Sequence, residues 1–133
     1  MIVLLDTNVV IYAVENPPSF GPRANAHLKT LRSAGHDFMI SDLTRMECLV
    51  GPLRAGNTLL ESDFRTFFTA AGMQVVPVSP AVCDRAALIR ATTRFKPMDS
   101  LQLAAAVEHG ANVFLTNDTR LSAFTGITVE VLP

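Results

Sequence analysis

Two acidic residues of this chain stand where a buried strand is predicted to end. Asp6 directly follows the apolar run Ile2–Leu5, and Asp118 follows Val113–Thr116 through Asn117. Such unbroken apolar runs are typical of strands buried on both faces of a parallel sheet. Open α/β sheets bind their ligands in the crevice beyond the carboxyl ends of the strands. We therefore expect Asp6 and Asp118 to face a ligand at one edge of a sheet.

Two further acids, Glu47 and Asp99, are expected on helices. Asp99 opens a predicted helix shortly after Pro97. Glu47 lies within the apolar stripe of its predicted helix, which is formed by Leu43, Met46, Val50 and Leu53. If that stripe faces the core, a carboxylate there is costly unless it is paired or faces a ligand cleft. We interpret Glu47 and Asp99 as members of the same site as Asp6.

Each of these acids also has a purely structural interpretation. Asp6 and Asp118 could cap the helical segments that follow them, Asp99 could be a first-turn acid favoured by the helix dipole, and Glu47 could pair with an arginine. Taken together, the four acids favour a common site. Unrelated structural acids have no reason to lie both at strand ends and on the inward stripe of a helix. Carboxylates ~4 Å apart repel by ~4 kcal/mol at an effective dielectric of 20. If the four carboxylates converge, either their pKa values must be raised or a divalent cation must lie between them. Oxygen ligands of this kind select Mg²⁺ or Mn²⁺.

The rest of the chain predicts the elements that position these acids. Strands are expected at 2–5, 38–41, 75–78, 112–115 and 127–132. Helices are expected at 7–15, 22–34, 43–53, 59–71, 80–94 and 99–109. Strands that alternate with helices predict a parallel sheet covered on both faces, an α/β/α sandwich. Pro77 indicates that the third strand lies at an edge.

Length and composition indicate one well-filled globular domain over residues 1–133. The chain is 49% hydrophobic and 17% charged. Cys48 and Cys83 lie in apolar surroundings without metal-ligand spacing and are expected to be buried thiols. No apolar run approaches the roughly 20 residues of a membrane span, so we expect a cytoplasmic protein without a membrane partner.

The net charge of −1 gives no general attraction to nucleic acid, so an RNA partner would need a local basic patch. The candidate phosphate track precedes Asp99 and consists of Arg85, Arg90, Arg94 and Lys96. The alternative is that these residues form an ordinary solvated helix face.

Four segments surround the four acids: LLDTNVVI, SDLTRMECL, KPMDSLQLAAAVEHGA and VFLTNDTRL. With these segments in this order, the chain resembles the PIN-domain ribonucleases, and most closely the VapC-type toxins of bacterial toxin–antitoxin pairs. The resemblance spans nearly the whole chain. It implies a PIN-like α/β/α sandwich with a five-stranded parallel sheet of order 3-2-1-4-5.

The resemblance also implies an activity and the residues that carry it. The expected activity is that of an Mg²⁺-dependent endoribonuclease, with Mn²⁺ as a substitute, in which water attacks the phosphate and leaves a 5′-phosphate and a 3′-hydroxyl. The acidic pocket comprises Asp6, Glu47, Asp99 and Asp118. Asp6, Asp99 and Asp118 are the expected metal ligands, with Glu47 holding a metal-bound water or a second ion. Asn8 and Thr116 are expected to support the ligands or position water.

The resemblance implies protein partners as well as RNA. A cognate antitoxin is expected, which silences such toxins when its arginine enters the acidic pocket. We also expect a homodimer, because the apolar faces exceed what a small sheet needs to cover itself. These faces are expected around Val10, Ile11, Phe64, Phe67 and Phe68.

Two other classes of protein share some of these features. A haloacid-dehalogenase-like phosphatase or a phospho-receiver domain also begins with a strand-end aspartate. The phosphatase pattern has a second aspartate where Asn8 stands, and both classes need a strand-end lysine that this chain lacks. The other alternative is a non-catalytic binding module whose acids are only structural. Retention of all four acids counts against that alternative.

Overall fold

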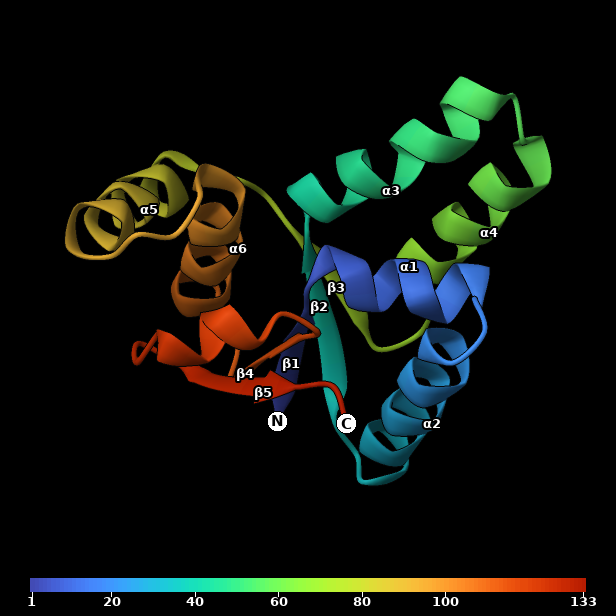
Figure 1. Cartoon of the computed structure of the whole chain (residues 1–133), viewed down its shortest axis with the longest axis horizontal. Helices are drawn as coiled ribbons and strands as arrows, with labels where there is room; N and C mark the ends of the chain where they lie inside the picture. Colours follow the sequence, from blue (N-terminus) through green and yellow to red (C-terminus); the bar gives the residue numbers. More distant parts are fainter.

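The computed structural model describes all 133 residues and contains one parallel sheet between two layers of helices (Figure 1). The strands are β1 (Ile2–Leu5), β2 (Asp37–Ser41), β3 (Met73–Val76), β4 (Val113–Thr116) and β5 (Thr128–Val131). Their order in the sheet is β3-β2-β1-β4-β5, and every neighbouring pair is parallel. The predicted α/β/α sandwich and the implied strand order are both confirmed. β3 lies at an edge as predicted, although it ends before Pro77.

Helices cover both faces of the sheet. They are α1 (Thr7–Glu15), α2 (Phe20–Ser33), α3 (Asp42–Ala55), α4 (Thr58–Phe68), α5 (Pro80–Thr92), α6 (Pro97–Glu108) and the short 3-10 helix η1 (Thr119–Ala123). Figure 1 shows α1 to α4 on one side of the sheet and α5 and α6 on the other. No helix combines the length and the hydropathy needed to span a bilayer.

The central position of β1 in the sheet explains why its sequence is apolar without alternation. It pairs with β2 on one side and with β4 on the other. Val3 and Leu5 face the core under α1 to α4, whereas Leu4 faces the core under α5 and α6. Because both faces of the strand are covered by helices, every position must be apolar until the chain reaches the end of the sheet at Asp6.

Several predicted surfaces differ from the observed ones. Val10, Phe64 and Phe68 are buried in the core, so the apolar faces predicted for a dimer are not exposed there. These side chains fill the space between the sheet and its own helices. Cys48 is buried as predicted, but Cys83 is exposed.

The prediction that the apolar stripe of α3 faces the core is also wrong. Met46, Val50 and Leu53 are 51%, 41% and 58% exposed. The buried side of α3 is formed instead by Thr44, Cys48, Leu49 and Pro52. Glu47 is half-buried beside this inward side, which directs it to the end of the sheet rather than into the core.

Candidate active site

Asp6 and Asp118 lie just beyond the carboxyl ends of two paired strands. β1 and β4 pair in register, with Leu5 opposite Leu115. Asp6 caps α1 by accepting a 2.9 Å hydrogen bond from the backbone N–H of Thr7. Asp118 caps η1 in the same way, with a 3.0 Å bond from the N–H of Arg120. Both residues therefore cap a helix and also face the end of the sheet.

One cleft of about 250 Å³ collects all four predicted acids, Asp6, Glu47, Asp99 and Asp118. They reach it from the residue after β1, from α3, from α6 and from the segment after β4. The other lining residues are Thr7, Asn8, Ile11, Met98 and Gln102. The fold thus gathers carboxylates that are far apart in the sequence at the crevice expected for an open α/β sheet.

The Asp6 carboxyl is the most buried of the four, with only 8% of the residue exposed. Burial raises the pKa of Asp6 to about 6. Hydrogen bonds from Thr116 and Thr7 oppose this rise, and the nearby negative charges of Asp99 and Glu47 add to it. The energetic consequence is that the folded protein disfavours the ionised form of Asp6 unless a cation is present.

Thr116 and Asn8 form hydrogen bonds to residues of the site and to the loop after β4. The Thr116 hydroxyl donates a 2.7 Å hydrogen bond to Oδ2 of Asp6, and its oxygen accepts the N–H of Asp118 at 3.0 Å. Asn8 accepts the backbone N–H of Asn117 at 3.4 Å and also lines the cleft. Both residues therefore accept a hydrogen bond from the backbone of the loop that carries Asp118.

A buried hydrogen-bond network holds Glu47. The Thr7 hydroxyl donates to Oε1 of Glu47 at 2.8 Å. Gln102 donates through Nε2 to Thr7 at 3.1 Å and to Thr44 at 2.8 Å. Its Oε1 accepts the hydroxyl proton of Ser41 at 2.7 Å. The network connects α1, α3 and α6, and it fixes the carboxylate of Glu47 toward the cleft.

The sequence analysis missed Thr7 and Gln102, although a signal for each was present. Thr7 directly follows Asp6 at the first position of α1. Gln102 lies one helical turn after Asp99, which places both residues on the same side of α6. A buried glutamine on the face of a helix that also carries a candidate ligand is a sign of such a network.

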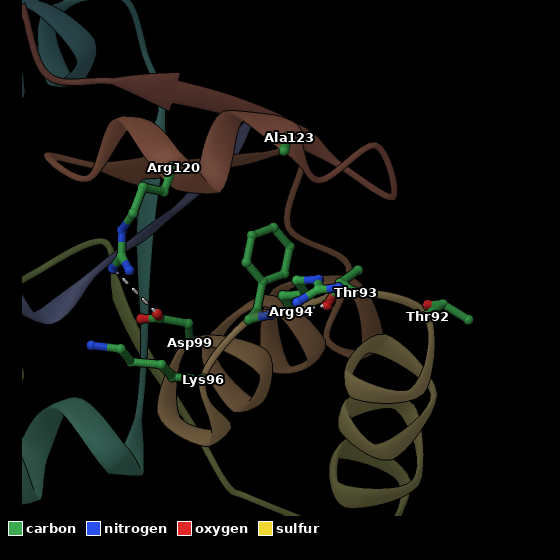
Figure 2. A pocket seen from close by; sticks show the side chains of 8 residues that line it. Thr92, Thr93, Arg94, Lys96, Asp99, Arg120 and Ala123 are labelled. Atoms are coloured by element: carbon green, nitrogen blue, oxygen red, sulfur yellow. Dashed lines mark hydrogen bonds and ion pairs between the residues drawn. The ribbon is translucent and has the colours of Figure 1, made fainter.

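Arg120 brings a positive charge to the mouth of the cleft. Its guanidinium donates hydrogen bonds to both carboxylate oxygens of Asp118. It also lies 3.9 Å from Oδ2 of Asp99 (Figure 2). Hydrogen bonding to Arg120 holds the pKa of Asp118 below its usual value. Burial raises the pKa of Asp99, and the charge of Arg120 partly offsets that rise. Two acids of the cleft are therefore engaged by an internal cation.

The chemistry of the donors fits a hard divalent cation such as Mg²⁺ or Mn²⁺, because several carboxylates face one cleft without a lysine or histidine among them. As the side chains stand, however, no three acidic, histidine or cysteine residues are close enough to hold one ion together. Thr7 and Thr116 donate hydrogen bonds to Asp6, while Arg120 donates to Asp118. Shared coordination by Asp6 and Asp118 would require Asp118 to leave Arg120.

The predicted phosphate track divides into two parts. Arg94 and Lys96 line a second cleft that adjoins the acidic one (Figure 2). Arg85 pairs instead with Glu108 at the far end of α6. Arg90 lines neither cleft. The structure thus brings only Arg94 and Lys96 close to the acids.

Solved structures of similar fold include bacterial complexes and a bacterial toxin. The chain is 18% identical to a chain of VapBC2 from Rickettsia felis bound to a promoter DNA fragment, with a TM-score of 0.80 and 100% of both chains covered. It is 21% identical to a chain of FitAcB from Neisseria gonorrhoeae, with a TM-score of 0.70, covering 96% of this chain and 95% of that one. The sarcin-ricin loop cleaving toxin VapC20 from Mycobacterium tuberculosis is 12% identical, with a TM-score of 0.69 and coverage of 94% and 98%.

Sequence comparison points to one family. No curated protein sequence matches the chain significantly. The PIN domain family matches residues 3–127, a range that contains β2, β3, β4, all of β1 except its first residue, and all four acids of the cleft. Of the five strands, only β5 follows the matched range. The chain therefore belongs to the PIN domain family.

Proposed function

We propose that this protein, as a single PIN domain over residues 1–133, is an endoribonuclease that depends on Mg²⁺, with Mn²⁺ as a substitute. The observation that carries the proposal is the convergence of Asp6, Glu47, Asp99 and Asp118 on one cleft at the end of the sheet. Hydrolysis of a phosphodiester needs a positioned water and stabilisation of negative charge on the phosphate. A set of carboxylates that holds a divalent cation supplies both.

Asp6, Asp99 and Asp118 are the residues that would hold the metal. When bound, a divalent ion lowers the pKa of water and stabilises the charge that develops on the phosphate. Glu47 is held by Thr7 through one carboxylate oxygen, which leaves its second oxygen to orient the attacking water. Thr116 keeps Asp6 in place, and Arg120 offers a cation to the phosphate when it leaves Asp118. Attack by water leaves a 5′-phosphate and a 3′-hydroxyl.

We further propose that the protein is the toxin of a toxin–antitoxin pair and forms a homodimer. The similar structures from Rickettsia felis and Neisseria gonorrhoeae, together with the sarcin-ricin loop cleaving toxin of Mycobacterium tuberculosis, support the toxin part of this proposal by likeness of fold. Membership in the PIN domain family also decides against the phosphatase and receiver-domain alternatives. Light scattering of the purified protein, alone and with the product of an adjacent antitoxin-like gene, tests the partners.

The activity is tested by incubating the purified protein with structured RNA in EDTA, and then after addition of Mg²⁺ or Mn²⁺. We expect cleavage only with the metal, and ends that a ligase specific for 5′-phosphate can join. The Asp6→Asn protein, prepared in the same way, controls for contaminating nucleases and should be inactive. Full activity in EDTA, or ends that carry a cyclic phosphate, would contradict the proposed mechanism.

A further inference from the structure

A second cleft of about 470 Å³ opens beside the acidic one and shares Asp99 with it. It is lined by the end of α5, by the loop 93–96 between α5 and α6, and by Arg120 and Ala123 of η1. Figure 2 shows Arg120 and Lys96 on either side of Asp99, with Arg94 farther along the loop. The volume lies within the ~300–1,000 Å³ typical of sites for small ligands. Because the two clefts share Asp99, a flexible chain could pass from one cleft to the other over this residue.

The cations of this second cleft have few partners. Neither Arg94 nor Lys96 forms an ion pair, and only Arg120 is engaged, by Asp118 and Asp99. By contrast, Arg65 is paired with Glu61. Three positive side chains therefore line the cleft against the single carboxylate of Asp99. Unpaired cations next to an acidic site are suited to hold the phosphates that flank a reacting phosphate.

The same cleft presents an aromatic ring, that of Phe95. The ring is half-buried and packs edge-on against Phe124, with centroids 6.3 Å apart and an interplanar angle of 71°. The backbone N–H of Phe95 bonds the Thr93 hydroxyl at 3.3 Å, and that hydroxyl donates to Ile89 at 2.7 Å. The loop is thus tied to the end of α5. An anchored aromatic ring among cations is the usual platform on which proteins stack an unpaired base.

We infer that this second cleft binds the nucleotide next to the scissile phosphate of single-stranded RNA, with its base against Phe95 and its phosphates on Arg94 and Lys96. The inference rests on the proposed nuclease function. Because Asp99 borders both clefts, a nucleotide held here is directly connected to the phosphate over the acids. The cleft therefore positions the RNA so that the phosphate next to the bound nucleotide lies over the acids.

Binding is measured in the Asp6→Asn background, where RNA is not cleaved, with a short fluorescein-labelled single-stranded RNA of mixed sequence at several salt concentrations. Arg94→Ala should weaken binding several-fold and reduce the slope of log K against log salt by about 0.7. Phe95→Leu keeps an apolar side chain without the ring and should weaken binding about tenfold. Phe95→Tyr restores the ring and should bind like the parent protein. The matched control is Arg65→Ala, which also removes one positive charge but lies on α4.

Thermal unfolding of each variant shows whether the change acts through the fold, since Phe95 also packs on Phe124. The inference is overturned if Arg94→Ala and Phe95→Leu bind RNA as the Arg65→Ala control does, or if Phe95→Tyr binds as weakly as Phe95→Leu. The proposed function is decided separately by cleavage with Asp6 intact. If the protein cleaves RNA while the cleft variants bind like the control, only the inference fails. If it cleaves no RNA, the proposed function fails, and the binding series still decides whether the cleft holds RNA.

Discussion

The side chain of Thr116 links two acids of the site directly. Its hydroxyl donates a 2.7 Å hydrogen bond to Oδ2 of Asp6, and its oxygen accepts the N–H of Asp118 at 3.0 Å. Thr116 is fully buried at the end of β4, where neighbouring strands leave it little freedom. One side chain therefore sets the relative positions of Asp6 and Asp118.

Replacing Thr116 with Val keeps the shape of the side chain and removes both hydrogen bonds. We expect cleavage to fall about 10- to 100-fold, because residues that orient metal ligands typically have effects of this size. The acidic limb of the pH–rate profile should move to higher pH, since loss of a hydrogen bond to the ionised form raises the pKa of Asp6 further. Thr116→Ser retains the hydroxyl and should preserve the profile. A Val variant with the activity and pH profile of the parent protein would remove Thr116 from the site.

Asp6→Asn should make the metal-free protein more stable at neutral pH. The pKa of Asp6 is raised from 3.8 to about 6, so the folded state prefers the protonated carboxyl. This contribution to stability is complete below pH ~4 and is lost as pH rises through about 6. Asn carries no charge at any pH, so the gain should be about 3 kcal/mol at pH 7 in EDTA and close to zero at pH 4. Denaturant unfolding at both pH values measures the difference.

Addition of Mg²⁺ gives a second readout of the same variant. A ligand that binds only the folded state raises its stability by mass action. We therefore expect Mg²⁺ to raise the unfolding temperature of the parent protein and to leave that of Asp6→Asn nearly unchanged. An equal rise in both proteins would mean that Asp6 does not hold the ion.

Gln102→Leu tests the buried network that holds Glu47. The change preserves approximate volume but leaves the hydroxyls of Ser41, Thr44 and Thr7 without the glutamine as partner. Unpaired buried polar groups are costly, so we expect a loss of about 2–4 kcal/mol in the free energy of unfolding. Gln74→Leu, at an exposed position of β3, is the control and should change stability by less than ~0.5 kcal/mol. Similar effects of the two substitutions would show that the network adds little stability.

Arg120→Ala should increase the affinity of the site for Mn²⁺ several-fold, because it frees Asp118 and removes a competing charge near Asp99. Arg120→Lys keeps the charge and should remain close to the parent protein. Since the ion pair is exposed, the unfolding temperature should hardly change. Calorimetric titration with Mn²⁺ measures the affinity. Weaker binding after Arg120→Ala would indicate that Arg120 organises the ligands instead of competing with the ion.

The strands and helices were predictable from sequence where the local pattern and the global fold agree. β1 reads as a buried central strand because helices cover both of its faces, and Asp6 stands out because it is the first polar residue after that run. Thr7–Glu15 is a helix over the predicted range, since Asp6 caps it and Asn16 ends it in a left-handed conformation.

The orientation of α3 was not predictable from its apolar spacing. Its stripe of Met46, Val50 and Leu53 is exposed, while polar Thr44 is buried because it bonds Thr7 and Gln102. Only the tertiary structure supplies those partners. Glu47 reaches the cleft for a different reason from the one predicted, namely the hydrogen bond from Thr7. The pairing of Arg120 with two acids depends likewise on how the loop after β4 folds back toward α6.

β1 comes first in the chain but lies in the middle of the sheet, paired with β4 near the other end of the sequence. The bond between Thr116 and Asp6 spans 110 residues. A chain still emerging from the ribosome therefore lacks β4, Thr116 and Asp118 until almost the whole domain has been made, and domains fold as units. Interrupted translation should yield only inert fragments, so a cell that makes the proposed nuclease is exposed to its activity only after synthesis is nearly complete.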